Sequence, residues 1–294
     1  MPQRSPRSHR FPPRLAASAL AAALATATAA AVAAAPAPLT LVVCAPGYPG
    51  STAEAQPTMD AFAAAVAQAA GWAPGSLAAV YHESAAAGLA RLGRNDAALA
   101  LVPLPFYLEH RAALRLQPLL QAVTAGGVAD EPWSLVAGKG KVAGAAGLDG
   151  FEIVGLPAYS PRFVRLALAG WGTIPASVKM TPSGAVLSAM RKAASGEKIA
   201  VLLDREQAAA LPTLPFAAQL ETVAQSPPLP VSVLCVVGAR LAHGRAQTLE
   251  RTLLGLAGSA SGAPALAAMR LHGFVAADSV ALRRAEQDFA RQKP

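Results

Sequence analysis

The feature that most constrains the fold is a regular alternation, from residue 39 onward, between short apolar runs and longer alanine-rich segments. Residues 39–44 (LTLVVC) are rich in β-branched side chains and predict a buried strand, whereas residues 45–52 (APGYPGST) predict a Gly/Pro loop. Further strands are predicted at 77–81 and 97–102, and helices at 59–70, at 84–92 and from 103 onward. Strands and helices in this order are typical of an α/β fold with a largely parallel sheet.

A second run of alternating elements begins near Glu131. Strands are predicted at 133–137, 151–156, 178–180 and 198–203, with helices at 160–169 and 183–194. Ser160 is a favourable N-cap, and Pro161 stands at the first helical position that proline prefers. The stretch QSPPLP at 225–230 then predicts a rigid connector, followed by a strand at 231–237 and by helices at 245–257 and 264–271.

The N-terminus has the pattern of a secretory signal. Residues 1–14 carry Arg4, Arg7, Arg10 and Arg14 without an acidic residue, and residues 15–34 form an alanine-rich apolar run. Val32 and Ala34 fit the small-x-small rule, so we predict a signal peptide over residues 1–34 that is cleaved after Ala34. An uncleaved membrane anchor is the alternative, because the run is about as long as a membrane span. Export predicts a periplasmic protein.

Charge and composition exclude some functional classes. Hydrophobic residues make up 53% of the chain and charged residues 14%, which excludes a disordered protein. The net charge is +8, and the four N-terminal arginines supply half of it. A remainder of +4 without a long basic run does not favour nucleic-acid binding. No nucleic-acid partner is therefore expected.

No catalytic or cofactor motif is present. The chain has no phosphate-binding loop of the Walker type, no G-x-S-x-G elbow and no paired metal-ligand spacing. His82, Glu83 and Ser84 are adjacent, and neighbouring residues on a strand point to opposite faces. We therefore expect a protein that is not an enzyme and that has neither a cofactor nor a metal site.

The two cysteines, Cys44 and Cys235, both lie in apolar, strand-like runs. Val43 does not supply the small residue that a bacterial lipoprotein signal places before its cysteine, so Cys44 is expected in the first strand rather than under a lipid. Two buried thiols are the favoured state, since isolated buried cysteines behave as small apolar residues. A disulfide stays open because export would permit one.

Three segments resemble one family of transport proteins. They are NDAALALVPLPFY at 95–107, SPPLPVSVLCVVGARL at 226–241 and LHGFVAAD at 271–278. The first resembles an aspartate–strand–Gly-Pro-Leu-Ser-Tyr segment, the second a return crossover, and the third a C-terminal Gly-Phe-x-x-x-Asp signature. All three occur in the periplasmic substrate-binding proteins of phosphate, phosphite and phosphonate ABC transporters. The resemblance covers nearly all of the chain after the signal.

This resemblance implies a two-lobed α/β fold of the type 2 periplasmic-binding-protein class. Each lobe would be a mostly parallel sheet flanked by helices, with two crossovers between the lobes. Lobe 1 would comprise residues 35–126 and 231–294, lobe 2 residues 131–225, and the hinge crossings residues 127–130 and 226–230. Closure about such hinges would trap a ligand between the lobes.

Candidate ligand-binding residues follow from topology, because ligands of open α/β sheets bind beyond the carboxyl ends of the strands, where helix N-termini point. Hydroxyls, aromatic rings and one cation stand at these positions. They are Tyr48, Ser51, Thr52, Phe106, Tyr107, Tyr159, Ser160, Arg162, Ser183 and Asp204, with Thr181 beside them. Several have a structural alternative: Ser160 and Asp204 are also good helix caps, and Tyr48 could simply pack its loop.

The chain departs from the family at its anion loop. The family's Pro-Ala-Ser-Thr-Ser-Gly corresponds here to PAYSPR at 157–162, which keeps one hydroxyl, on Ser160, and loses an N–H donor at Pro161. Arg162 would supply a positive charge instead. The family's His-Asp pair appears as Ser183 and Gly184. A phosphonate is therefore only one option for the ligand, beside another small oxyanion or an organic solute.

The sequence thus predicts an exported, monomeric receptor that captures a small ligand and delivers it to the membrane permease of an ABC transporter. A ligand-sensing module for a membrane signalling partner is an alternative, and an enzyme on the same two-lobed fold is another. The sequence does not separate transport from sensing, because both require the same closure around a ligand.

Overall fold

A computed structural model describes residues 38–48 and 50–293 of the chain. The predicted signal peptide, residues 1–34, lies outside these residues. Residues 36–294 form one compact unit. Within the described part of the chain, no helix is both long enough and apolar enough to cross a membrane.

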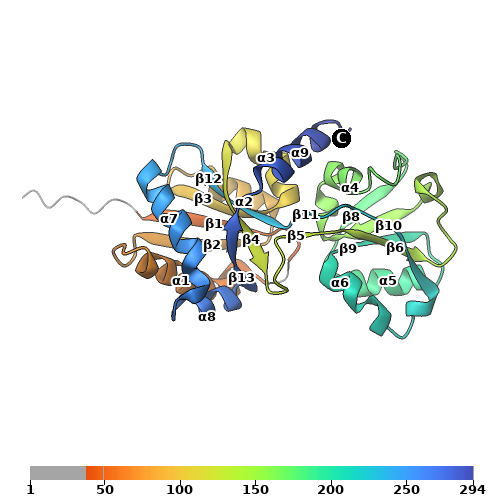
Figure 1. Cartoon of the computed structure of the whole chain (residues 1–294). Helices are drawn as coiled ribbons and strands as arrows, with labels where there is room; N and C mark the ends of the chain where they lie inside the picture. The colour runs from red at the N-terminus through yellow and green to blue at the C-terminus, as the bar shows by residue number, and fades with distance from the viewer. Residues whose placement is uncertain (1–37, 49, 294) are drawn as a thin grey trace, which may run out of the picture. The chain divides into compact units, whose positions relative to one another are not determined.

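The first lobe is built on a six-stranded sheet (Figure 1). Its strands are β1 (Leu39–Cys44), β2 (Leu77–His82), β3 (Ala97–Pro103), β4 (Leu116–Thr124), β12 (Ser232–Val237) and β13 (Leu271–Ala276). Their order across the sheet is β13-β4-β12-β3-β1-β2. The helices of this lobe are α1 (Thr52–Ala69), α2 (Ala85–Leu92), α3 (Leu104–Leu114), α7 (His243–Gly255), α8 (Gly262–Ala268) and α9 (Ser279–Ala290).

The second lobe is built on a five-stranded sheet in the order β10-β6-β9-β7-β8. Its strands are β6 (Ser134–Gly138), β7 (Glu152–Gly155), β8 (Lys179–Pro182), β9 (Ile199–Leu203) and β10 (Leu220–Gln225). Its helices are α4 (Pro161–Ala167), α5 (Val186–Ala194) and α6 (Arg205–Ala210). All of these elements come from one continuous stretch of chain between the two crossings.

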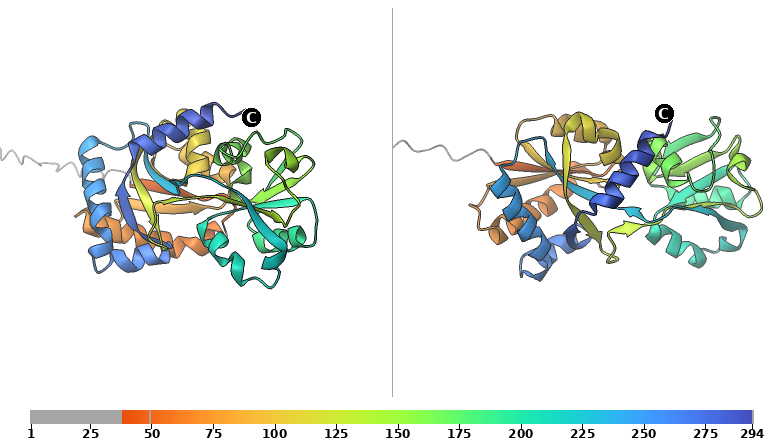
Figure 2. Two further views of the ribbon diagram at one scale, coloured as in Figure 1. Left: turned by 45° about the vertical axis from the view of Figure 1, so that its right-hand side comes forward. Right: turned by 45° about the horizontal axis from the view of Figure 1, so that its top comes forward.

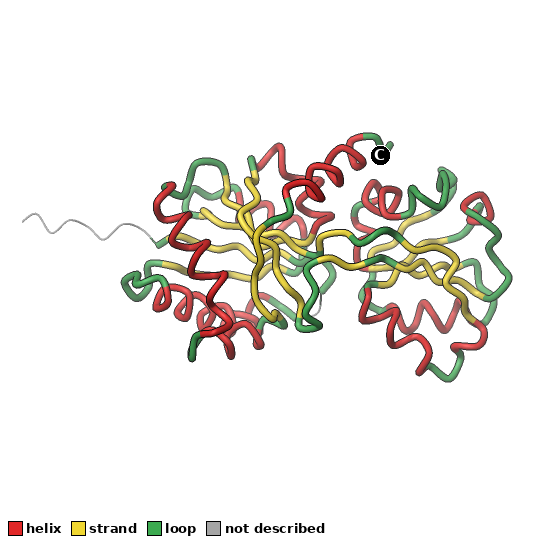
Figure 3. Tube along the Cα trace, in the orientation of Figure 1, coloured by secondary structure: helices red, strands yellow, loops and turns green. Residues whose placement is uncertain are grey.

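The two crossings pair with each other. β5 (Asp130–Glu131) and β11 (Leu229–Pro230) form a short antiparallel ribbon that connects the two sheets, as the tube in Figure 3 shows. The N–H of Val231 donates to the carbonyl of Ala129 at 2.9 Å. On the side of the second lobe, the Ser226 hydroxyl accepts from the N–H of Trp133 at 2.8 Å. The crossings therefore form one hydrogen-bonded connection between the lobes.

The predicted fold class is confirmed, but the expectation of mostly parallel sheets is wrong. β1 pairs in parallel with β2 and β3, whereas β12 pairs antiparallel with β3 and β4, and β13 pairs antiparallel with β4. In the second sheet, β7 pairs in parallel with β8 and β9, and β6 pairs antiparallel with β9 and β10. Both sheets are mixed because β12 and β13 in the first sheet, and β6 in the second, run against the other strands.

Local sequence chemistry sets the helix boundaries. The Ser51 side chain accepts from the N–H of Glu54, and the Glu54 carboxylate accepts from the N–H of Ser51, which forms a capping box that starts α1 at Thr52. The sequence pattern had located only the part of this helix from residue 59 onward. Ser84 and Ser160 cap α2 and α4, as the sequence predicts.

Apolar clusters pack against both faces of the first sheet. One lies among β1, β3, α1, α7 and α8, and another, larger cluster continues from the first lobe into the second. In that larger cluster Trp133 meets Phe163 edge to face at 5.8 Å, and Phe289 of α9 is buried. α9 contacts both α3 and α4, and Figure 2 shows it running from the first lobe toward the second. The C-terminal helix therefore packs against both lobes.

Candidate functional site

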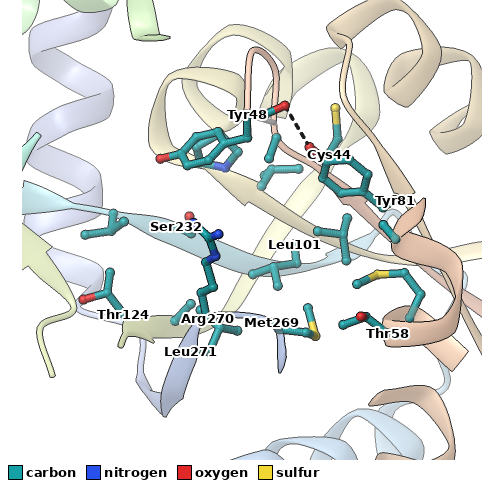
Figure 4. Close-up of a pocket in the computed structure, with 18 of the residues that line it drawn as sticks. Cys44, Tyr48, Thr58, Tyr81, Leu101, Thr124, Ser232, Met269, Arg270 and Leu271 are labelled. Atoms are coloured by element: carbon teal, nitrogen blue, oxygen red, sulfur yellow. Dashed lines mark hydrogen bonds between the residues drawn. The ribbon is translucent and has the colours of Figure 1, made fainter. Parts of the chain in front are cut away.

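A cavity of about 340 Å³ opens at the edge of the first sheet where the carboxyl ends of β1, β2 and β3 lie (Figure 4). The start of β12, the end of β4 and the start of β13 lie at the same edge, because these strands run antiparallel to one another. The lining residues are Val43, Cys44, Ala45, Tyr48, Ala55, Thr58, Met59, Tyr81, Leu101, Val102, Pro103, Ala122, Thr124, Val231, Ser232, Ala268, Met269, Arg270 and Leu271. This is the edge at which the topology of an open α/β sheet predicts ligand binding.

The walls of this cavity are mostly apolar, and hydroxyl groups are distributed among them. The Tyr81 hydroxyl donates to the backbone carbonyl of Tyr48 at 3.3 Å, which fixes the loop after β1 over the end of β2. Thr58, Thr124 and Ser232 add further hydroxyls. Arg270 is the one charged residue of the lining. Such a mixture of apolar wall and a few polar groups is typical of a site that binds a small molecule.

The lining does not contain a group suited to acid–base catalysis at neutral pH. Among the residues that the structure describes, the lining includes no His, Asp, Glu or Lys. Cys44 is a free, buried thiol, and burial, followed by the charge of Glu83, raises the pKa of that thiol to about 12. A thiol of that kind stays protonated and is a poor nucleophile. Cys235 is also free and buried.

Of the ten predicted ligand-binding residues, Tyr48 is the one that lines the cavity. It belongs to the loop that follows β1, and 40% of its surface is exposed. Its partly enclosed position, and then the nearby carboxyls of Asp204 and Glu131, raise the pKa of Tyr48. Both carboxyls belong to the crossing or to the second lobe. Tyr48 therefore faces the junction between the lobes.

The other predicted residues of the first lobe have structural contacts. Ser51 caps α1, and the Thr52 hydroxyl donates to Glu83 at 3.2 Å. Phe106 and Tyr107 lie in α3 with exposed fractions of 0% and 1%. The Tyr107 hydroxyl donates to the carboxylate of Glu286 in α9 at 2.6 Å. These four residues lie outside the lining of the cavity.

In the second lobe, Ser160 and Arg162 bind helices of the first lobe. The Ser160 hydroxyl is fully buried, donates to the carboxylate of Glu109 in α3 at 2.6 Å and accepts from the N–H of Phe163. The guanidinium of Arg162 lies 4.1 Å from the centroid of the Phe289 ring and donates to the Phe289 carbonyl at 3.1 Å. Groups of α3 and α9 therefore occupy the hydrogen-bonding positions at the start of α4.

Four further candidates of the second lobe are spread over separate positions. The Tyr159 hydroxyl is buried without a hydrogen-bond partner among the described residues, and burial raises its pKa well above the usual value. Asp204 caps α6 by accepting from the N–H of Gln207 at 2.8 Å, and burial raises the pKa of its carboxyl. The Ser183 hydroxyl accepts from the N–H of Ala185, and Thr181 donates to Glu152.

The sequence pattern did not identify several residues of the site. Glu131 lies in the crossing ribbon with 6% of its surface exposed, and burial, then the charge of Asp204, raises the pKa of its carboxyl to about 7. It directly follows the predicted crossing at 127–130, and that position could have identified it. Tyr81 ends a predicted strand, so the topological rule could have included it. Arg270 gave no such signal, because its segment was expected to be helical.

No protein-family model matches the chain, and no curated protein matches it. Solved structures do match. XAC2383 from Xanthomonas citri, bound to ATP, has a TM-score of 0.66 and 16% identity, covering 87% of this chain and 98% of that chain. PhnD1 from Prochlorococcus marinus, in complex with methylphosphonate, has a TM-score of 0.62 and 14% identity, covering 87% and 98%.

A binding protein component of an ABC phosphonate transporter from Pseudomonas aeruginosa has a TM-score of 0.57 and 17% identity, covering 86% of this chain and 87% of that chain. Each match extends over both sheets, since each covers most of the chain. At these identities the likeness is one of fold. The chain therefore has the two-lobed α/β fold of the solute-binding proteins of ABC transporters.

Proposed function

We propose that this protein is an exported receptor that captures a small solute between its two lobes and delivers it unchanged to the permease of an ABC transporter. One observation carries the proposal: the cavity lies directly beside the hinge. Thr124 ends the strand before the first crossing, Ser232 begins the strand after the second, and both line the cavity. A ligand in this position would contact the segments that must move when the lobes open or close.

The contacts between the lobes support a closing movement. Glu109 of α3 holds Ser160, and the loop after β1 approaches the second lobe so closely that a Cβ on Gly47 would lie 3.1 Å from the Leu156 side chain. A ligand that adds contacts to this arrangement, and not to an open one, would shift the population toward it. Its binding energy is the source of the conformational change.

The proposed lobes are residues 35–126 with 231–294, and residues 131–225. In this arrangement Tyr48 is the ligand contact of the first lobe. Asp204 is a polar group of the second lobe whose charge raises the pKa of Tyr48. Tyr159 contributes a buried hydroxyl that has no hydrogen-bond partner among the described residues.

The similar structures do not determine the ligand of this protein. One is bound to ATP and another to methylphosphonate, so the same fold accepts ligands of different size. The start of α4, which the sequence predicts as an anion-binding loop, is occupied here by the Glu109 carboxylate. A free oxyanion at Ser160 would have to displace that carboxylate. The cavity at the first sheet is therefore the better position for a ligand.

Delivery to a permease and a periplasmic location complete the proposal. The predicted signal peptide supports export, and the fold shared with ABC transporter components supports a permease partner. The lining offers no acid–base group for turnover, which supports release of the ligand unchanged.

A thermal-shift screen of the chain from residue 35 onward tests this function. The panel contains phosphate, phosphite, phosphonates, sulfonates and small carboxylates. A ligand at one hundred times its Kd adds about 2.7 kcal/mol to the free energy of unfolding, which raises the Tm by several degrees. Tyr48→Ala should reduce this rise, whereas Leu254→Ala, at an exposed position of α7, should not.

Mass spectrometry of the recovered compound then separates a receptor from an enzyme. We expect the compound back unchanged after prolonged incubation. Conversion of the compound would contradict the receptor, and a panel in which nothing raises the Tm would contradict binding of these solute classes.

A further inference from the structure

Arg270 is a solvent-exposed cation that lines a mostly apolar cavity and has no anionic partner among the described residues. Its side chain extends from the start of β13 into the cavity, toward Ser232 and the ring of Tyr48 (Figure 4). Among the described residues, no carboxylate lies within ion-pair distance of its guanidinium, and its side chain makes no hydrogen bond. Five N–H donors are therefore available to a ligand.

The backbone of Arg270 adopts a conformation that costs energy for an arginine. Its φ is 56°, in the left-handed region where glycine is the least costly residue. Its N–H donates to the Ala267 carbonyl at 2.9 Å, and its carbonyl accepts from the N–H of Ala125 in the first crossing at 3.1 Å. These bonds hold the residue against the hinge and direct its side chain into the cavity.

The rest of the lining is suited to an apolar body with one polar end. Met59, Leu101 and Met269 form apolar wall, and the thioether side chains adapt to ligands of different shape. The Ser232 hydroxyl lies on the side to which the guanidinium points. A ligand oriented by these groups would place its charge at Arg270 and its hydrocarbon against the methionines.

We propose that the cavity binds an organic monoanion, with a single carboxylate on an apolar body, and that Arg270 binds the carboxylate. The inference rests on the proposed function and names its ligand class. A planar guanidinium matches a carboxylate with two parallel hydrogen bonds. The ring of Tyr48 would lie beside the bound carboxylate, toward which the guanidinium points.

The charges around the cavity favour one negative charge over two. Arg270 is the one cation among the described residues of the lining, and the charge of Asp204 acts on Tyr48 from the side of the second lobe. A dianion such as a phosphonate would bring a second negative charge toward Asp204 without a second cation to balance it.

Isothermal titration calorimetry tests the inference. The ligands are phenylacetate, benzoate and hexanoate, together with phenylacetamide, the neutral analogue of phenylacetate. We expect at least one carboxylate to bind and its amide to bind at least about tenfold more weakly. In Arg270→Gly the affinity for the carboxylate should fall by roughly tenfold to a hundredfold, because a hydrogen-bonded charge is lost. The variant should fold, since glycine suits this backbone conformation.

Arg115→Gly is the matched control. Arg115 is the other described non-glycine residue with a positive φ, at 52°, and it lies outside the cavity lining. This variant removes the same charge from the same backbone conformation and should bind the carboxylate as the wild type does. Equal loss of affinity in both variants would assign the effect to net charge and overturn the role of Arg270.

Three further outcomes distinguish a failure of this inference from a failure of the function on which it rests. If all carboxylates fail to bind while methylphosphonate or phosphate binds, the protein is still a solute receptor and the proposed ligand class is wrong. If a carboxylate binds equally well to Arg270→Gly, the assignment of Arg270 is wrong. If no compound of either panel binds, both proposals are overturned.

Discussion

Gly88 has to be a glycine because the side chain of Cys44 occupies the space that a Cβ would need. It lies in α2, and a Cβ at this position would lie 2.2 Å from the sulfur of Cys44 and 2.8 Å from its Cβ. Cys44 is fully buried at the end of β1, at the edge of the cavity, and its thiol donates to the Ser84 carbonyl. The close approach of α2 to β1 therefore depends on the absence of a side chain.

Gly88→Ala should lower the free energy of unfolding by roughly 1–3 kcal/mol, because the added methyl overpacks the core at Cys44. Gly244→Ala is the control, since a Cβ in that first turn of α7 would meet no atom within 4 Å. That variant should be neutral or slightly stabilising. Urea unfolding of both variants measures the difference, and equal midpoints would contradict the predicted clash.

At the scale of elements, α3 and α4 are joined across the lobes by one buried hydrogen bond. Ser160→Ala removes the cap of α4 and leaves the Glu109 carboxylate without its donor. We expect a loss of about 1–3 kcal/mol in unfolding free energy. Ser195→Ala, at an exposed residue, should stay within about 0.5 kcal/mol of the wild type. Urea unfolding measures both variants. A midpoint for Ser160→Ala as high as that of Ser195→Ala would show that the hydrogen bond between Ser160 and Glu109 contributes nothing to stability.

Elements with an unambiguous sequence pattern were predicted well. β1 occupies the same residues that its run of β-branched side chains predicts, and Ser84 caps α2 as expected. α1 was predicted too short, because its capping box lies in a Gly/Pro-rich segment that resembles a loop. The predicted helix at 264–271 overlaps β13, because the left-handed backbone of Arg270 ends α8, and local pattern does not indicate that conformation.

For the whole molecule, the sequence predicts which edge of the sheet holds the site but not which residues line it. Tyr48 follows a clear strand and was found, whereas Arg270, Thr58 and Ser232 reach the cavity from distant parts of the chain. Ser160 and Tyr107 occupy expected positions at helix starts, but packing between α3, α4 and α9 buries them. Burial of this kind depends on tertiary contacts that a local pattern does not contain.

The hinge predicts a dependence of whole-molecule stability on pH. The pKa of Glu131 is about 7 in the folded protein against an ordinary value of 4.5, so the folded state binds its proton more tightly. Its contribution to stability is therefore greatest below pH 4.5 and is lost as the pH rises from there to about 7. The full loss is at most on the order of 3 kcal/mol.

Glu131→Gln removes this titration, so its Tm relative to the wild type should rise between pH 5 and pH 8. Glu197→Gln removes one carboxylate at an exposed position and serves as the control. Differential scanning calorimetry across this range measures the difference. A constant difference between Glu131→Gln and the wild type would contradict a buried, protonated hinge carboxyl.

The position of β12 has a consequence for the order in which the molecule can be completed. β3 and β4 follow each other along the chain, yet β12 lies between them in the sheet. In a nascent chain that has reached only the end of the second lobe, one edge of β3 and both edges of β4 are still unpaired, and exposed edges invite pairing with other chains. The gap between β3 and β4 is filled only when residues 232–237 form β12. Synthesis or export that stalls before residue 232 would leave an aggregation-prone intermediate, however well the inserted second lobe has folded.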